Sequence, residues 1–260
     1  MTGRRSTSTT AGAARTAPVR RTFRAAYREL AAAQKGVARS APAYSRYINR
    51  RLGRVLAAWA ASVGLTPNQV TGGSALFTFA GIALLALGSP SWVLGVAVCL
   101  CLVLGYAFDS ADGQVARLTG TGSAAGEWLD HVVDATKISA LPLALVVGLY
   151  RAEAVPDAWL LVPIAHAVVG AVLFFAMILT EQLRRAVGVR SQAVAGGSGP
   201  DLRALLVVPT DYGVLCLVFL LLGAVPAFQI AYSFIVLATL LFTAAACVKW
   251  FRDVRALPTV

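Results

Sequence analysis

Long runs of apolar residues dominate the chain after residue 68. Each of six runs approaches the ~20 residues that a helix needs to cross a ~30 Å hydrocarbon core. The six segments are 69–88, 92–116, 128–150, 158–180, 206–224 and 228–248. The pattern therefore predicts an all-α membrane protein with six transmembrane helices.

The stretch before these runs, residues 43–63, has a different period. Its apolar residues recur at three- and four-residue spacing, and its arginines largely occupy the other side of the helix that this spacing implies. The apolar set is Tyr44, Ile48, Leu52, Val55, Trp59 and Val63, and the basic set is Arg46, Arg50, Arg51 and Arg54. We predict an N-terminal amphipathic helix in the plane of an anionic headgroup layer, ended by Gly64 and Pro67. The alternative is a helix whose apolar side packs on protein.

Composition agrees with a membrane location, because 58% of the residues are apolar, 13% are charged and the mean hydropathy is +0.71. The net charge of +11 is concentrated in residues 1–66, which hold thirteen basic residues and one acidic residue. The rest of the chain offers no polar basic face for nucleic acid, so an anionic membrane surface is the expected partner. Residues 1–42 are expected to be a disordered cytoplasmic arm, with a transit peptide as the alternative.

Basic residues also predict the orientation in the membrane. Most of those after residue 66 lie in the connections after the second and fourth segments and in the tail. They are Arg117, Arg184, Arg185, Arg190, Arg203, Lys249, Arg252 and Arg255. By the positive-inside rule both termini are cytoplasmic, in a plasma membrane such as a bacterial inner membrane. The expected division is an interfacial helix within 43–66, a six-helix catalytic domain over 67–250 and a tail over 251–260.

Four aspartates lie at the cytoplasmic ends of the second and third segments. Asp109 and Asp112 are three residues apart, and Asp130 and Asp134 are four apart, so each pair lies on one helix face. Asp109 and Asp134 are equally far from the turn joining two antiparallel helices. The two pairs are therefore expected to meet.

Four carboxylates in a low-dielectric site repel one another unless cations neutralise them. Oxygen ligands favour Mg²⁺, Mn²⁺ or Ca²⁺ over zinc, and two such ions would clamp a diphosphate. Gly113 and Ala116 leave room for a substrate, and Arg117 can bind phosphate oxygens. The residues alone also allow a cation or proton pathway, or structural pairing with Arg and Lys.

The spacing Asp109-x2-Asp112-Gly113-x2-Ala116-Arg117-x8-Gly126-x3-Asp130-x3-Asp134 resembles the signature of the CDP-alcohol phosphotransferases. These are six-helix membrane enzymes that move a substituted phosphate from a CDP-linked donor to an alcohol and release CMP. All eight signature positions are present. A weaker resemblance extends over 43–250 and includes the opening of the first crossing, Thr66-Pro67-Asn68-x2-Thr71.

The resemblance implies a role for each signature position. Asp109, Asp112 and Asp130 would be the main ligands of two Mg²⁺ or Mn²⁺ ions, with Asp134 near the metals as the general base. The pocket for the cytidine diphosphate would be shaped by Asn68, Gly113, Ala116, Arg117 and Gly126. A homodimer is also implied. The function expected is phospholipid synthesis, with CDP-diacylglycerol as donor and a polar alcohol as acceptor.

The substrate is less determined than the family. Lys137 lies on the face of Asp134 and is either an acceptor contact or a counter-ion. Basic residues in the fourth connection, Arg184, Arg185 and Arg190, are further candidates for acceptor binding. His131 after Asp130 resembles the choline and ethanolamine enzymes instead. The alternative reaction moves a CDP-linked headgroup (ethanolamine, choline or inositol type) to a lipid alcohol or to inositol phosphate.

Overall fold

The structure is a computed structural model that describes residues 21–33, 44–189 and 210–258. All of its regular elements in those ranges are helices. In chain order they are α1 (Phe23–Ala33), η2 (Ser45–Asn49), α2 (Arg50–Val63), α3 (Pro67–Leu87), α4 (Trp92–Thr119), α5 (Ala124–Arg151), η3 (Asp157–Leu160), α6 (Leu161–Ala186), α8 (Tyr212–Val218), η6 (Phe219–Gly223) and α9 (Val225–Arg255). The prediction of an all-α protein is confirmed for this part of the chain.

Five helices are long and apolar enough to cross a membrane: α3, α4, α5, η3 with α6, and α9. These five indicate an integral membrane protein. The predicted crossing at 206–224 corresponds to α8 and η6, which together span Tyr212–Gly223. At 1.5–2 Å per residue this unit covers roughly 20 Å, less than a ~30 Å core. Residues 206–209 lie outside the described ranges, so a sixth crossing stays a prediction.

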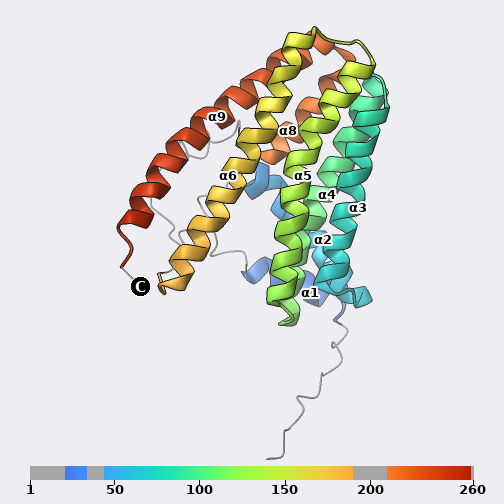
Figure 1. Cartoon of the computed structure of the whole chain (residues 1–260). Coiled ribbons are helices and arrows are strands. Elements are labelled where there is room, and N and C mark those ends of the chain that lie inside the picture. Colours follow the sequence, from blue (N-terminus) through green and yellow to red (C-terminus); the bar gives the residue numbers. More distant parts are fainter. Residues whose placement is uncertain (1–20, 34–43, 190–209, 259–260) are drawn as a thin grey trace, which may run out of the picture.

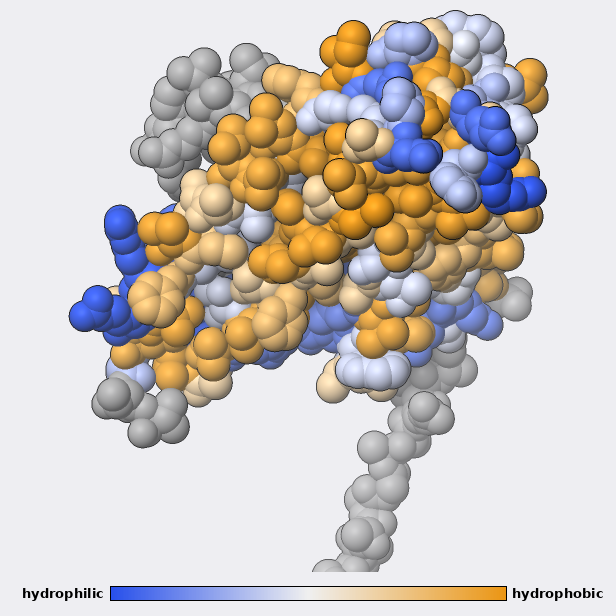
Figure 2. Space-filling view, turned by 45° about the horizontal axis from the view of Figure 1, so that its top comes forward, coloured by the Kyte–Doolittle hydropathy of each residue, from blue (hydrophilic) through white to orange (hydrophobic). Residues whose placement is uncertain are grey.

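The helices form a tight group and a diverging pair. Helix α3 packs against both α4 and α5, whereas α6 and α9 run next to each other and diverge from that group toward one end (Figure 1). The same end holds α1, α2 and the C-terminal part of α9 (Figure 1). A wide hydrophobic surface separates hydrophilic clusters on the face drawn in Figure 2, as expected of helices that contact lipid.

Glycines bring the three central helices close together. A Cβ on Gly105 of α4 would overlap Thr78 of α3, and one on Gly148 of α5 would overlap the carbonyl oxygen of Leu85. Small residues at such contacts allow helix backbones in membranes to approach closely. This close packing fixes the positions of the ends of α3, α4 and α5 relative to one another. The acidic residues lie near these ends.

Helix α2 uses its small residues for packing and leaves its larger apolar residues uncovered. It packs against α4 and buries Gly53, Ala57, Ala58, Ala60 and Ala61. Leu52, Val55, Trp59 and Val63 are between 41% and 47% exposed. No other described segment of this chain covers these residues, and packing of this side on another protein stays the alternative. The placement of α2 at a membrane surface stays a prediction.

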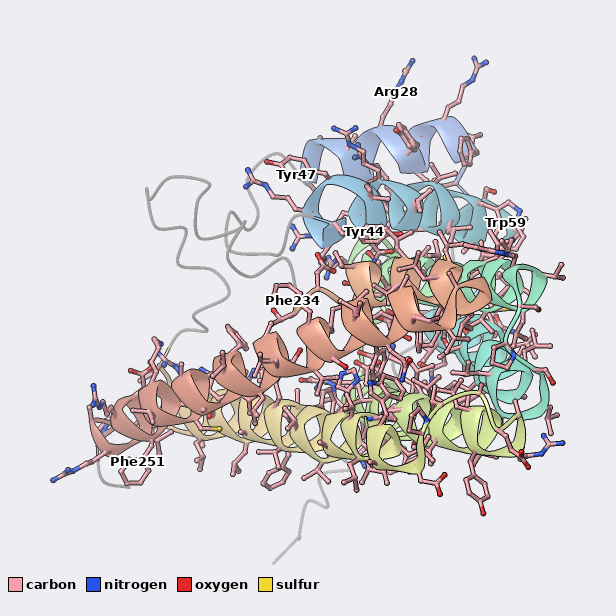
Figure 3. The ribbon with its side chains drawn as sticks, turned by 90° about the horizontal axis from the view of Figure 1, so that it is seen from above. Arg28, Tyr44, Tyr47, Trp59, Phe234 and Phe251 are labelled. Atoms are coloured by element: carbon pink, nitrogen blue, oxygen red, sulfur yellow. The ribbon has the colours of Figure 1, made fainter. Side chains whose placement is uncertain are left out.

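The expectation of a disordered arm over 1–42 is wrong for Phe23–Ala33, which forms α1. Ala26 and Leu30, four residues apart, are buried with the alanines of α2. The Arg54 guanidinium lies 5.3 Å from the centre of the Tyr27 ring, and Arg28 points away from the bundle (Figure 3). Short apolar residues that contact a second helix therefore order this segment. Residues 1–20 and 34–43 lie outside the described ranges.

Candidate active site

Three helix ends meet beside the acidic residues, and local sequence determines where each helix begins or ends. Thr66 and Gln69 form a reciprocal capping box that starts α3 with Pro67 in its first turn. Helix α4 ends at Gly120, whose φ of +66° glycine adopts without strain. Ser123 accepts a hydrogen bond from Gly126 N and starts α5. The turn between α4 and α5 is therefore short, and Gly126 is helical.

A cavity of about 520 Å³ lies between these three helix ends. Its lining includes all five residues that the resemblance assigns to the nucleotide: Asn68, Gly113, Ala116, Arg117 and Gly126. Two of the four aspartates, Asp112 and Asp130, also line it. Residues from three helices, up to 63 positions apart in the chain, thus surround one space of a size that suits a small-molecule ligand.

Two glycines keep this cavity open. A Cβ on Gly126 would lie 3.1 Å from Asn68 Oδ1, which is tighter than normal contact. A Cβ on Gly113 would lie 3.5 Å from Arg117 Nη1, so a longer side chain there would occupy the space in front of the guanidinium. The absence of side chains at these positions is therefore part of the shape of the site.

The aspartates differ in their contacts. Thr71 Oγ1 donates to Asp112 Oδ2 over 2.7 Å, which orients this buried carboxyl from α3. Lys137 Nζ lies 2.7 Å from Asp109 Oδ1 and 2.5 Å from Asp134 Oδ1, and its side chain is only 7% exposed. Lys137 thus bridges α4 and α5 as a counter-ion, the second of the two roles expected for it. Contact with an acceptor stays a prediction.

Part of the cluster suits a divalent cation. Asp130, His131 and Asp134 each offer a ligand atom, and these atoms lie within 4.8 Å of one another. Between Asp109 and Asp134 a side-chain ammonium already occupies the position where positive charge is needed. Two of these three residues are aspartates, and carboxylate oxygens are the ligands that Mg²⁺ and Mn²⁺ prefer. Asp130 and Asp134 therefore fit a divalent cation.

A family model described as CDP-alcohol phosphatidyltransferase matches residues 64–250, which is more than two thirds of the chain. The chain belongs to the CDP-alcohol phosphatidyltransferase family. No individual protein matches it in a comparison with curated sequences. As a member of this family the chain is a phosphotransferase that moves a phosphoalcohol from a CDP-alcohol donor to an alcohol acceptor, and the family uses divalent metal. This favours the enzyme over the ion pathway that the aspartates alone allowed.

The arginines expected to bind the acceptor of this CDP-alcohol phosphatidyltransferase have acidic partners. Arg185 Nη1 lies 2.5 Å from Glu127 Oε1 and Arg185 Nε lies 3.4 Å from Glu181 Oε1. Arg184 Nη1 lies 3.6 Å from Asp253 Oδ2 of α9. These pairs connect α6 to α5 and to α9 at the end where the acids lie. Acceptor binding stays a prediction for both residues, and Arg190 lies outside the described ranges.

Sequence reasoning missed several residues of the CDP-alcohol phosphatidyltransferase site. Glu127 and Ser123 line the cavity although neither is a signature position. Arg50 of α2 is a further basic residue toward this end: burial, and then the positive charge of Arg117, lower the pKa of the Arg50 guanidinium. The signal for Ser123 was present, since a serine three residues before Gly126 is a common helix start. The nearness of Arg50 required the packing of α2 on α4.

Proposed function

We propose that this CDP-alcohol phosphatidyltransferase transfers a phosphatidyl group from CDP-diacylglycerol to a polar alcohol in phospholipid synthesis. The observation that carries the proposal is the cavity in which five signature residues surround a space bordered by Asp112 and Asp130. Its helix N-termini and Arg117 suit the anionic diphosphate. Gly113 and Gly126 let the nucleotide approach the helices.

The reaction proposed is an in-line displacement at the phosphorus atom next to the diacylglycerol. Asp134 takes the proton of the acceptor hydroxyl, whose oxygen forms a bond to this phosphorus. The bond between the same phosphorus and the bridging oxygen breaks, and CMP leaves with that oxygen. Arg117 stabilises the charge on the phosphates, and Thr71 holds the Asp112 carboxyl in place through its hydrogen bond.

Two divalent ions, Mg²⁺ or Mn²⁺, would be held by Asp109, Asp112, Asp130 and Asp134, and when bound they would neutralise the diphosphate and activate it toward attack. The support is the group Asp130, His131 and Asp134, whose ligand atoms lie within 4.8 Å of one another. Because Lys137 holds Asp109 and Asp134 at hydrogen-bonding distance, it keeps both carboxylates in position. Chelation of divalent ions is expected to abolish turnover.

The alternative reaction uses a CDP-linked headgroup as donor and a lipid alcohol or inositol phosphate as acceptor. One observation favours it: His131 follows Asp130 and lies beside the cluster, 3.8 Å from Glu127. In both reactions the cytidine diphosphate occupies the same cavity. The acceptor assay decides between them.

For the membrane arrangement we propose that the end holding the active site is cytoplasmic. Helices α1 and α2, which are rich in arginine, and the basic end of α9 lie toward this end (Figure 1). Anionic headgroups are the natural partner for these side chains. A homodimer stays a prediction of the family resemblance.

The test is CMP release by the purified chain in detergent with Mg²⁺ or Mn²⁺. CDP-diacylglycerol is offered with inositol phosphate, glycerol phosphate, serine or inositol, and CDP-ethanolamine, CDP-choline or CDP-inositol with diacylglycerol or inositol phosphate. We expect turnover with CDP-diacylglycerol and one polar alcohol, and at least a thousandfold loss in Asp134→Asn. Turnover only with a CDP-linked headgroup would support the alternative. No CMP release from any pair by folded, CMP-binding protein would contradict the proposed function.

A further inference from the structure

A group of aromatic and polar residues borders the acidic cluster outside the nucleotide cavity. The Tyr212 ring, at the start of α8, has Lys137 Nζ 5.9 Å from its centre, and Lys137 bridges Asp109 and Asp134. None of these four residues is among those lining the nucleotide cavity. The cluster therefore has a nucleotide side and a second side on which Tyr212 lies.

The position of Tyr212 is fixed by its neighbours in the chain. Asp211, 2% exposed, accepts hydrogen bonds from Gly213 N at 3.0 Å and from Ser45 N at 3.1 Å. It thereby caps α8 and ties this helix to η2. A Cβ on Gly213 would overlap the Tyr44 ring, so the two segments are in close contact. Tyr212 is consequently held on a rigid support.

Two neighbouring tyrosines, Tyr106 and Tyr44, also restrict the ring of Tyr212. The Tyr106 ring packs edge-on against it with 5.1 Å between ring centres and stacks on Tyr44 on another side. Asn49 Nδ2 donates to the carbonyl oxygen of Tyr106 at 3.2 Å. Rings held in this way lose little further freedom when a ligand binds.

Two polar atoms of this group are buried without hydrogen-bond partners. They are the Tyr212 hydroxyl oxygen and Asn49 Oδ1, and the Asn49 side chain belongs to a residue that is 1% exposed. The Tyr212 hydroxyl belongs to the ring whose centre lies 5.9 Å from Lys137 Nζ, the ammonium that bridges Asp109 and Asp134. A buried polar group without a partner costs free energy, so the Tyr212 hydroxyl is a candidate for binding a ligand on this side of the cluster.

The direction of attack places the acceptor on this side. In an in-line displacement the attacking oxygen and the leaving oxygen lie on opposite sides of the phosphorus. The leaving CMP belongs to the nucleotide cavity, which Asp134 does not line. An acceptor whose hydroxyl faces Asp134 therefore lies toward Lys137 and Tyr212.

We propose that Tyr212 is an acceptor-binding residue whose hydroxyl hydrogen-bonds to a small polar alcohol beyond the hydroxyl that reacts. The inference rests on the proposed function and narrows its acceptor. The Tyr212 hydroxyl has no hydrogen-bond partner and suits a polyol or a headgroup alcohol, because a lipid alcohol would leave it unpaired. A second hydroxyl of a polar acceptor would give it a partner.

The experiment compares Tyr212→Phe and Tyr212→Leu with a matched control, Tyr232→Phe. Tyr232 is also a buried tyrosine, but its hydroxyl is hydrogen-bonded to His166 Nδ1 at 2.7 Å within the core. For each protein we would measure KM for donor and acceptor, kcat, and the shift in melting temperature caused by each alcohol in the presence of CMP and Mg²⁺. We expect Tyr212→Phe to raise the acceptor KM about five- to tenfold with the donor KM unchanged. Tyr212→Leu, which also removes the ring beside Lys137, should raise it further.

Several outcomes would overturn the inference. They are an acceptor KM in Tyr212→Phe equal to that of the wild type, an equal rise in Tyr232→Phe, or a matching rise in the donor KM. Turnover with a CDP-linked headgroup and diacylglycerol would also overturn it while leaving the family activity intact. If no donor and alcohol pair releases CMP, the proposed function fails. The change in melting temperature caused by each alcohol then tests whether Tyr212 binds an alcohol. A shift with a polar alcohol that Tyr212→Phe abolishes supports the inference, and no shift overturns it.

Discussion

At the scale of single residues, the shape of the site depends on its glycines as much as on its charged residues. Gly113 faces Arg117, and Gly126 faces Asn68, each at a distance that a larger residue would close. The signature predicted that both positions must be small. The structure adds the partner that each glycine accommodates, which the sequence could not supply because Asn68 is 58 residues from Gly126.

Replacing Gly113 with leucine is expected to block the nucleotide cavity. The new side chain would fill the space in front of Arg117, so CMP affinity should fall at least tenfold by isothermal titration calorimetry. Leucine is a better helix former than glycine, so α4 should not lose stability.

The matched control for this variant is Gly72→Leu. Gly72 lies in α3, is exposed, and a Cβ there meets no atom within 4 Å. CMP binding should stay within about twofold of the wild-type value. Equal affinity in Gly113→Leu and in the wild type would show that the cavity does not hold the nucleotide.

At the scale of elements, the apolar runs predicted the long helices well and the short ones poorly. Hydropathy identified α3, α4, α5, α6 and α9, because a membrane-crossing helix is longer than most other apolar segments. It did not distinguish α8 and η6 from a full crossing. It also missed α1, whose buried residues Ala26 and Leu30 lie at helical spacing and meet the alanines of α2.

Asp211 offers a test of how a single element is held in place, because its carboxylate connects α8 to η2. Asp211→Ala removes the cap of α8 and leaves Ser45 N and Gly213 N without their acceptor. We expect a loss of about 1–2 kcal/mol in SDS unfolding of the protein in mixed micelles. Hydrogen exchange should accelerate in α8 more than in α3.

Ser91→Ala is the control, since Ser91 caps α4 by accepting a hydrogen bond from Leu94 N at an exposed position. It should cost a comparable amount or less and leave exchange in α8 unchanged. If the amide hydrogens of α8 exchange at the wild-type rate in the Asp211→Ala variant, Asp211 does not hold this helix in place.

At the scale of the whole molecule, α1 connects the N-terminal segment to the catalytic end. It packs on α2, and α2 packs on α4, which carries Asp109 and Asp112. The active site itself lies between α3, α4 and α5. Loss of α1 should therefore affect stability more than turnover.

Deleting residues 1–20 and deleting residues 1–40 separate these two effects. The shorter deletion keeps α1 and should leave both melting temperature and turnover near wild type. The longer one exposes the alanine face of α2 and should lower the melting temperature by several degrees while leaving most turnover at 20 °C. Complete loss of turnover in the longer deletion would mean that α1 takes part in the site.

The sequence by itself determined the membrane class, the long helices and the chemistry of the site. Hydrophobic length depends on bilayer thickness, and two carboxylate pairs at helical spacing lie on one face in any helix. Only the tertiary structure decided which groups pair: Lys137 with both Asp109 and Asp134, Thr71 with Asp112, and Arg185 with Glu127. It also placed Tyr212 beside Lys137, 75 positions earlier. Such contacts depend on how helices are rotated and how closely they approach, and glycines and buried caps set both.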